Sequence, residues 1–347
     1  MTSQIKNKIL LDALNCKAVE RPPIWLLRQA GRYQEEYRKL RKTESNFLNF
    51  CKNPELTTAA AMIPINNYNL DASILFSDIL TTPEALGMDL SFKDQIGPVF
   101  SNPISKAADI DSLDTDNCRQ KLEYVATAVK TLKKELCNKI PLIGFCGSPW
   151  TLATYMIEGQ SSKTHSKLKS FVFNNPALTH SLLEKLATSL TEQLELQIEA
   201  GADVVMIFDS WGGILSLPHY EEFSLNYIKE IIKNIKHKYK VPVIVFTKGG
   251  NAWLPQISRS GCDAISIDWT LPLAAARESI PSNIAIQGNL DPSILYGDYA
   301  YIEKNVLELL GQHAKIPGYI FNLGHGIPKD VDPKKVKFLA DLILNFK

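Results

Sequence analysis

The chain has 347 residues, of which 45% are hydrophobic and 22% are charged, so it is long and apolar enough to bury a full core. Its formal net charge of +1 argues against a general nucleic-acid-binding protein, because such proteins carry a basic excess or a basic stripe. The six cysteines form no C-x-x-C or H-x-C pair, and no apolar run approaches the roughly 18 residues of a membrane-spanning helix, so we expect a reduced, cytoplasmic protein without a zinc site or a membrane partner.

Eight short apolar runs, each bounded by turn residues, follow one another along the chain. Each is short enough to be a strand buried on both faces, and several are rich in Val, Ile and Phe. They lie at residues 24–27, 72–76, 141–146, 203–208, 241–246, 264–267, 284–287 and 319–323. Helical patterns lie between them, such as the Leu-rich segment that begins at Asn175-Pro176 and ends near Gly201.

This alternation predicts an α/β fold, a single (β/α)₈ TIM-type barrel with extra helices, and leaves a doubly wound open sheet as the alternative. No low-complexity linker or sharp shift in composition divides the chain, so we expect one barrel domain over residues 1–347. The long connection from Ser77 to Ile140 is expected to carry the extra helices and an irregular stretch at about residues 97–103.

Barrel enzymes keep their chemistry at the carboxyl ends of the strands. The polar residues just past the apolar runs are Arg28, Asp78, Ser148, Asp209, Ser210, Lys248, Asp268, Asn289 and His325. Ordinary turns also use such residues, but several charged groups at one edge favour a functional site, because burying them unpaired is costly. No G-x-S-x-G, P-loop or G-x-G-x-x-G pattern accompanies them.

A basic stretch at residues 28–42 stands out from the balanced overall charge. It contains Arg28, Arg32, Arg38, Lys39, Arg41 and Lys42 against only Glu35 and Glu36. By itself such a run is typical of a solvated helix face. If a strand led directly into a helix here, Arg32 would lie about half a turn beyond Arg28 and both could face the same site.

Two longer motifs give the chain its resemblance to the uroporphyrinogen decarboxylase family. Residues 21–33 read RPPIWLLRQAGRY and resemble the N-terminal signature of that family, and residues 144–159 read GFCGSPWTLATYMIEG and resemble its second signature. The shorter pieces FSDIL at 76–80, FDSW at 208–211 and NLGHG at 322–326 follow in the family's order. The resemblance covers essentially the whole chain.

The resemblance implies a homodimeric carboxy-lyase with one deep cleft per subunit and no metal or organic cofactor. The implied reaction converts the four acetate side chains of uroporphyrinogen III to methyl groups, which gives coproporphyrinogen III and four CO₂ in haem biosynthesis. On the matching positions, the implied substrate-binding residues are Arg28, Arg32, Arg41, Asp78, Tyr155, Ser210 and His325.

The chemistry of these residue types fits a substrate with eight carboxylates. Arginines form bidentate contacts with carboxylates, and an ionised Asp78 can accept pyrrole N–H bonds and offset the positive charge of a protonated ring. Asp78 and Arg28 are the expected catalytic residues. The proton donor stays unassigned, because an arginine with a pKa above about 12 is a poor acid at neutral pH, and His325 could instead bind a propionate.

Two alternatives remain at this point. The first is a corrinoid-linked methyltransferase of the same superfamily, which would use zinc held by His and Cys. The second is a non-catalytic tetrapyrrole-binding protein. The five histidines other than His325 follow no ligand spacing and are expected on the surface or on helices.

Overall fold

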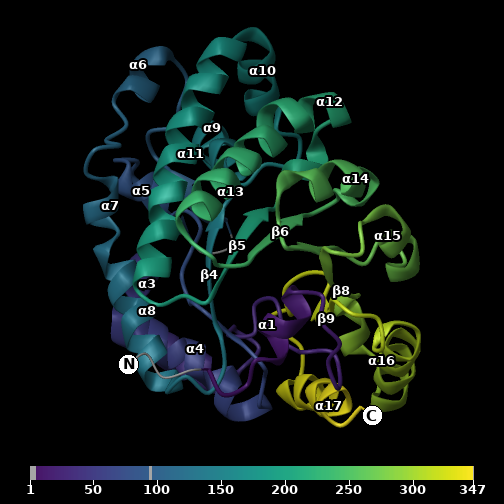
Figure 1. The fold of residues 1–347 in the computed structure, drawn as a ribbon. Helices are drawn as coiled ribbons and strands as arrows, with labels where there is room; N and C mark the ends of the chain where they lie inside the picture. Colours follow the sequence, from purple (N-terminus) through teal and green to yellow (C-terminus); the bar gives the residue numbers. More distant parts are fainter. Residues whose placement is uncertain (1–4, 94–95, 347) are drawn as a thin grey trace.

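Seven of the eight predicted strands form one parallel sheet in the computed structural model, which describes residues 5–93 and 96–346 (Figure 1). The strands are β1 (Ser73–Ile74), β4 (Leu142–Gly147), β5 (Val204–Asp209), β6 (Val243–Thr247), β7 (Ala264–Ser266), β8 (Ala285–Leu290) and β9 (Tyr319–Leu323), in that spatial order. Nearly all their residues are buried, because helices cover the outer face and side chains fill the inner one. The predicted α/β, TIM-like fold is confirmed.

The first predicted strand, residues 24–27, is not a regular strand. Ile24 makes one isolated parallel bridge to Phe321 of β9, and its carbonyl accepts the N–H of Asp71 just before β1 at 2.8 Å. Prolines at 22 and 23 have no N–H to donate to a ladder, and a turn follows at once. This irregular segment therefore joins the two edge strands of the curled sheet, and the prediction of eight regular strands is wrong at this position.

Asp71 holds this junction together. Its carboxylate accepts two hydrogen bonds from the Arg21 guanidinium, at 2.7 and 2.9 Å, and one from the Ile24 N–H at 2.8 Å. Asn7 donates a fourth bond at 2.9 Å. The side chain of Asp71 is 1% exposed and that of Arg21 is 13% exposed, so the pair is largely shielded from water.

Helices follow most of the strands and cover the outside of the sheet. The longer ones are α4 (Pro54–Tyr68), α8 (Glu123–Leu136), α9 (Pro149–Glu158), α10 (Ser166–Asn174), α11 (Pro176–Glu199), α13 (Asn226–Lys238), α16 (Tyr299–His313) and α17 (Pro333–Leu344). The shorter ones are α1 (Ile9–Leu14), α2 (Glu35–Arg41), α3 (Phe47–Cys51), α5 (Thr81–Ala85), α6 (Ala107–Asp111), α7 (Cys118–Lys121), α12 (Leu217–Tyr220), α14 (Leu254–Ile257) and α15 (Leu273–Ser279). Short helical turns are η1 (Gly212–Ile214), η2 (Glu221–Leu225), η3 (Asn251–Trp253), η4 (Ser258–Ser260) and η5 (Pro292–Tyr296).

The long connection after β1 carries more regular structure than the sequence indicated. Besides helices α5 to α8, it contains an antiparallel hairpin of β2 (Leu90–Lys93) and β3 (Gly97–Phe100). The prediction of an irregular stretch at 97–103 is therefore wrong for its first four residues. The hairpin is held from outside, because Phe100 donates its N–H to the Gly159 carbonyl at 2.7 Å and Phe92 packs edge-on against Phe47 at 4.7 Å.

One contiguous apolar core runs from Leu10 to Ile343 and includes residues of every strand from β2 to β9, and Ile74 of β1 packs against it. Trp150 and Met156 of α9 and Cys146 of β4 are fully buried in it, as their sequence context indicates. Within residues 5–93 and 96–346, none of the helices combines the length and the apolar character that crossing a membrane requires.

Candidate active site

Arg28 lies in the tight turn that ends the irregular segment. Its backbone is left-handed (φ 60°), and the Gln29 N–H closes the turn on the Leu26 carbonyl at 2.9 Å. Its side chain lies directly over Gly326, where an added Cβ would come 2.9 Å from the Cβ and 3.0 Å from the Nε of Arg28. Glycine is therefore required at 326, and this close approach brings the Gly-His-Gly turn after β9 against Arg28.

Arg32 lies in a loop, not on a helix, because α2 begins only at Glu35. The loop is held by the Tyr33 hydroxyl, which donates to the Gln29 carbonyl at 2.6 Å, and by Arg38, which donates to the Arg32 carbonyl at 2.8 Å. The Arg32 side chain is exposed, and its charge contributes, after burial, to lowering the pKa of Arg28. The two guanidiniums thus face a common space that suits anionic groups.

Asp78 follows β1 and faces Arg28. Its Oδ1 accepts the Leu80 N–H at 2.8 Å, and its carbonyl accepts the Thr81 hydroxyl at 2.8 Å. Burial raises the pKa of the Asp78 carboxyl, while the Leu80 N–H and the charge of Arg28 partly offset that rise. In the described part of the chain Oδ2 has no hydrogen-bond donor, so this oxygen can accept bonds from a ligand.

Tyr155 of α9 lies beside the same pair. Burial raises the pKa of its phenol, the Asp78 carboxylate raises it further, and Arg28 lowers it. Its ring packs edge-on against Trp211 at 6.1 Å. Ser210 precedes that tryptophan and is half-buried, and no residue in the described ranges hydrogen-bonds its hydroxyl.

Two other strand-end acids have structural partners instead of facing the site. Asp209 is fully buried and accepts the hydroxyls of Ser148, Thr151 and Ser224 at 2.6, 3.0 and 2.8 Å. Ser148 also caps α9 by accepting the Thr151 N–H at 3.0 Å. These contacts saturate the Asp209 carboxylate, so it stabilises the strand end and does not bind a ligand.

Asp268 and Asn289 are saturated in the same way. The Asp268 carboxylate accepts the Gly249 N–H at 2.7 Å, the Asn251 amide at 2.7 Å and the Thr270 hydroxyl at 2.6 Å. Asn289 donates its amide to the carbonyl of Asp268 at 2.9 Å and to that of Leu271 at 2.7 Å. Both residues therefore fix the loops after β6 and β7.

His325 lies in the turn after β9, with its ring 6.2 Å from that of Phe246 on β6. Burial and, after it, the charges of Arg28 and Lys248 lower the pKa of His325 to about 4, whereas the Asp268 carboxylate raises that pKa. The imidazole is therefore neutral at pH 7 and lacks the additional proton that an imidazolium would donate as an acid.

We expect the ring of His325 to titrate near pH 4 in the free protein and clearly higher when a polycarboxylate is bound, because bound anions favour the imidazolium. Histidine NMR against pH measures both values. The folded pKa lies below the ordinary 6.5, so the stabilising contribution of this group is present above pH 6.5 and is lost as the pH falls toward 4. A pKa near 6.5 for His325 in the free protein would contradict the buried, positively charged environment described for its ring.

Arg41 differs from the other two predicted arginines. Its guanidinium donates to the carbonyls of Glu44 and Ser45 and lies over the rings of Phe47 and Phe50, at 5.3 and 5.6 Å. It therefore holds its own loop closed in this structure. The structure brings Arg28, Arg32, Asp78, Tyr155 and His325 together, and we call these five residues the strand-end cluster.

Sequence reasoning missed a row of three phenylalanines, one of which packs against His325 of this cluster. Phe145, Phe208 and Phe246 stand on three adjacent strands, with ring separations of 5.6 and 6.2 Å. Their positions inside apolar runs gave no sign of a role at the site. The expectation that the other histidines lie on the surface or on helices is wrong for His165, which is 4% exposed and lies just before α10; His313 is buried but is the last residue of helix α16.

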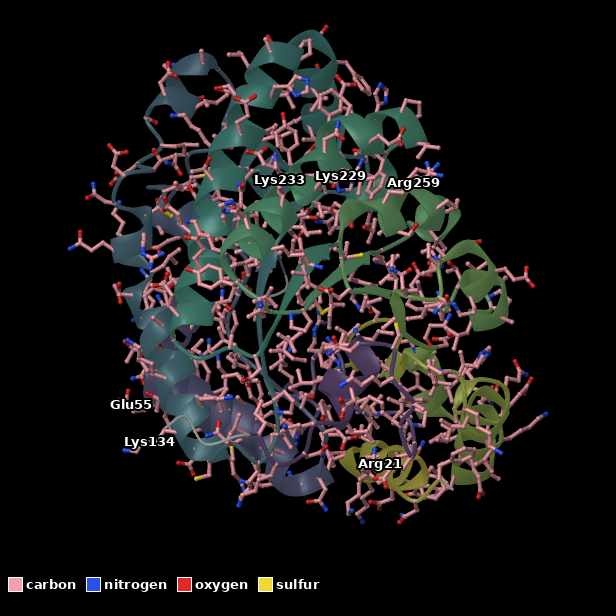
Figure 2. The ribbon with its side chains drawn as sticks, viewed as in Figure 1. Arg21, Glu55, Lys134, Lys229, Lys233 and Arg259 are labelled. Carbon is pink, nitrogen blue, oxygen red and sulfur yellow. The ribbon has the colours of Figure 1, made fainter. Side chains whose placement is uncertain are left out.

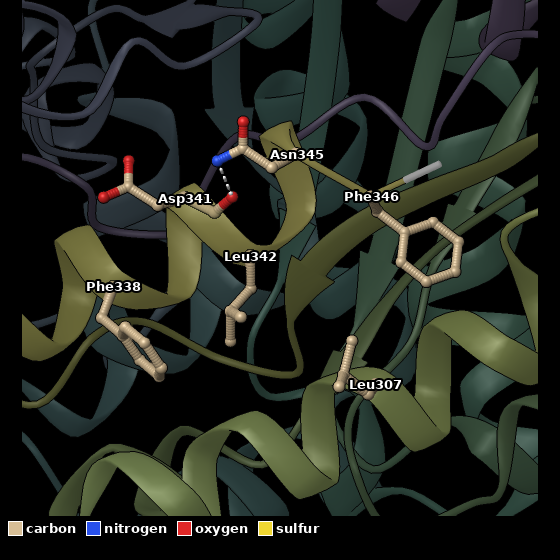
Figure 3. Close-up of a pocket in the computed structure, with 6 residues that line it drawn as sticks. All are labelled: Leu307, Phe338, Asp341, Leu342, Asn345 and Phe346. Atoms are coloured by element: carbon tan, nitrogen blue, oxygen red, sulfur yellow. Dashed lines mark hydrogen bonds between the residues drawn. The ribbon is translucent and has the colours of Figure 1, made fainter.

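A separate surface hollow of about 330 Å³ lies between α16 and α17 (Figure 3). Its lining is mostly apolar and consists of Leu307, Phe338, Asp341, Leu342, Asn345 and Phe346. The carboxylate of Asp341 pairs with Lys337 at 2.8 Å, and no residue of the strand-end cluster contributes to this hollow.

Comparison with known proteins gives consistent matches over the whole chain. The family model described as uroporphyrinogen decarboxylase (URO-D) matches residues 5–346. The uroporphyrinogen decarboxylase of Tolumonas auensis is 48% identical over 347 residues, covering 99% of this chain and 98% of the relative. That of Ruthia magnifica is 48% identical over 339 residues, covering 97% and 98%.

Solved structures share the fold at much lower identity. A methyltransferase from Methanosarcina mazei superposes with a TM-score of 0.81 at 18% identity and covers 99% of each chain. A B12-independent methionine synthase from a Shewanella species superposes with a TM-score of 0.51 at 10% identity, covering 84% of this chain and 86% of that one. At these identities the likeness concerns the fold alone.

Proposed function

This chain belongs to the uroporphyrinogen decarboxylase family, and from that membership we propose that the strand-end cluster is where its substrate binds and reacts. The chain is a carboxy-lyase of haem biosynthesis, which converts the four acetates of uroporphyrinogen III to methyl groups and releases four CO₂. The observation that supports this placement is Asp78, a half-buried carboxylate beside Arg28 and Tyr155, one oxygen of which has no hydrogen-bond donor among the described residues.

The proposed chemistry uses the pyrrole itself as the electron sink. A proton added to a ring carbon makes the pyrrole a cation, the bond between the acetate CH₂ and its carboxylate breaks, and the electron pair enters the ring as CO₂ leaves. A proton on the exocyclic carbon and loss of the ring proton complete the methyl group. Asp78 would accept the pyrrole N–H groups and stabilise the cation, a preorganised charge being most effective where water is excluded.

Among the residues of the strand-end cluster, Arg28 suits the role of proton donor best. Burial and the neighbouring Arg32 lower the pKa of Arg28, which moves its guanidinium toward the range of a usable acid. His325 is disfavoured as the donor, because its lowered pKa of about 4 leaves it neutral. We propose that Arg28 protonates the pyrrole and that Arg32, Tyr155, Ser210 and His325 bind and orient carboxylates. Arg41 would also bind a carboxylate only if its guanidinium released the carbonyls of Glu44 and Ser45.

Three further features are proposed with this function. A single domain over residues 1–347 is supported by the contiguous core. A homodimer that needs no metal or organic cofactor is supported by family membership. A cytoplasmic location is supported by the six cysteines, all of which are free thiols.

The direct test is anaerobic incubation of metal-stripped protein with uroporphyrinogen III, with the oxidised products separated by carboxylate number. We expect stepwise loss of four carboxylates down to the four-carboxylate product without added cofactor. Substrate that kept all eight carboxylates in the presence of folded protein would favour a methyltransferase or a tetrapyrrole carrier. Activity that returned only with added metal would contradict the cofactor-free reaction.

A further inference from the structure

Lys248 follows β6 directly and carries a charge that the proposed mechanism leaves unused. Thr247 turns its hydroxyl outward, where it lies 2.9 Å from the Tyr220 hydroxyl, whereas Phe246 turns its ring inward toward His325. The Lys248 N–H still donates to the Asp209 carbonyl of β5, at 3.2 Å, so sheet pairing extends to this residue. Because side chains alternate along a strand, Lys248 faces the same side as Phe246.

The backbone of Lys248 is held rigidly by its neighbour η1. Its carbonyl accepts the Gly213 N–H at 3.1 Å. A Cβ on Gly213 would collide with that carbonyl oxygen and lie 2.8 Å from the Cα of Gly249, so the two turns pack without a gap. The lysine therefore projects from a fixed point at the end of the strand.

The ammonium of Lys248 is not neutralised by the acids around it. Asp209 and Asp268, at the ends of the flanking strands, already accept the fixed donors described above. Among the described residues Lys248 has no ion-pair partner, and it is exposed to solvent. Its charge nevertheless acts on His325, whose pKa it lowers together with the charge of Arg28.

Lys248 also lies across the sheet from Arg28. Around the curled sheet the order is the 24–27 segment, β1, β4, β5, β6, β7, β8 and β9, so β6 stands opposite the segment that carries Arg28.

A tetrapyrrole bears carboxylates around its whole rim, and Arg28 with Arg32 can neutralise only one side of it. We propose that Lys248 binds a propionate carboxylate of the tetrapyrrole on the wall opposite these arginines. The inference rests on the proposed function and adds a substrate-binding residue to it. A propionate is specified because propionates remain through all four steps, whereas the acetates are consumed.

The test compares Lys248→Met with Lys229→Met, a matched change of a lysine on helix α13, which lies on the outside of the sheet (Figure 2). Anaerobic kinetics are measured with substrates carrying eight, seven, six and five carboxylates. For Lys248→Met we expect KM to rise about 10-fold for each substrate, the usual worth of one hydrogen bond to a charged group, with kcat little changed. Lys229→Met should behave as the wild type. An unchanged KM, or a rise that fades as acetates are lost, would overturn the propionate assignment.

A second measurement does not depend on turnover. In Lys248→Met the pKa of His325 should rise, because one of the two cations facing it is removed while Arg28 and Asp268 remain. Binding of oxidised uroporphyrin should weaken in Lys248→Met and not in Lys229→Met. If the wild type failed to decarboxylate, the proposed function would fall. If the wild type is active and both variants match it in KM, His325 pKa and porphyrin affinity, only the inference about Lys248 falls.

Discussion

Replacing Asp78 with Asn is expected to lower kcat by about 10²- to 10³-fold, the usual effect of removing one preorganised electrostatic group from an active site. The amide keeps the shape of the side chain but cannot supply the negative charge that offsets a protonated pyrrole. Turnover of uroporphyrinogen under anaerobic conditions measures the effect. Near-wild-type turnover in this variant would contradict the electrostatic role proposed for Asp78.

The same variant should not be less stable than the wild type. Burial raises the pKa of Asp78, so its contribution to folding is favourable below the ordinary pKa of 3.8 and is lost as the pH rises through the higher folded value. At pH 7 the neutral amide avoids this loss, so the midpoint of thermal unfolding should stay equal or rise. The exposed Asp111→Asn serves as the matched control and should change neither turnover nor stability. Loss of activity accompanied by a fall in Tm would indicate a structural role for Asp78.

Replacing Asp71 with Asn is expected to lower the free energy of unfolding by about 3–5 kcal/mol, because it leaves a largely buried Arg21 without its counter-charge. The wild-type carboxylate accepts two bonds from Arg21 and ties the 24–27 segment to β1 through Ile24. Denaturant unfolding at neutral pH measures the change. Since Arg28 ends this segment, the surviving folded fraction should also bind substrate more weakly.

The matched control for this prediction is Asp12→Asn, which breaks the surface pair between Asp12 and Lys17. Their side chains are 38% and 65% exposed, and pairs of this kind contribute about 0–1 kcal/mol. Equal unfolding midpoints for the two variants would show that the Arg21–Asp71 pair does not hold the sheet edges together. The contrast also separates the loss of a shielded pair from the removal of one negative charge.

Asp78 and Asp209 illustrate why strand-end acids differ in role although they look alike in sequence. Both follow an apolar run, and burial raises the pKa of both carboxyls. Asp209 is surrounded by three hydroxyl donors from α9 and η2, whereas Asp78 has one backbone donor and faces Arg28. The number of fixed donors, together with the partial exposure of Asp78, distinguishes the acid that holds the fold from the one available to substrate.

The amino-acid sequence by itself determined the element types and the family. Strand and helix formation depend on apolar periodicity and caps within a few residues, so β9 was predicted with its observed bounds and α11 with its start. The two signatures contain Arg28, Arg32 and Tyr155 of the strand-end cluster, and the shorter motifs FSDIL and NLGHG contain Asp78 and His325, because each motif is a local run of sequence.

Only the tertiary structure decided how those residues are used. It made the first predicted strand an irregular junction, tied Arg41 to its own loop, set Gly326 against Arg28 and left His325 neutral. All of these outcomes except the local contacts of Arg41 depend on groups far apart in the chain. Burial, hydrogen-bond saturation and the sum of neighbouring charges are properties of the assembled sheet, and a local sequence pattern does not contain them.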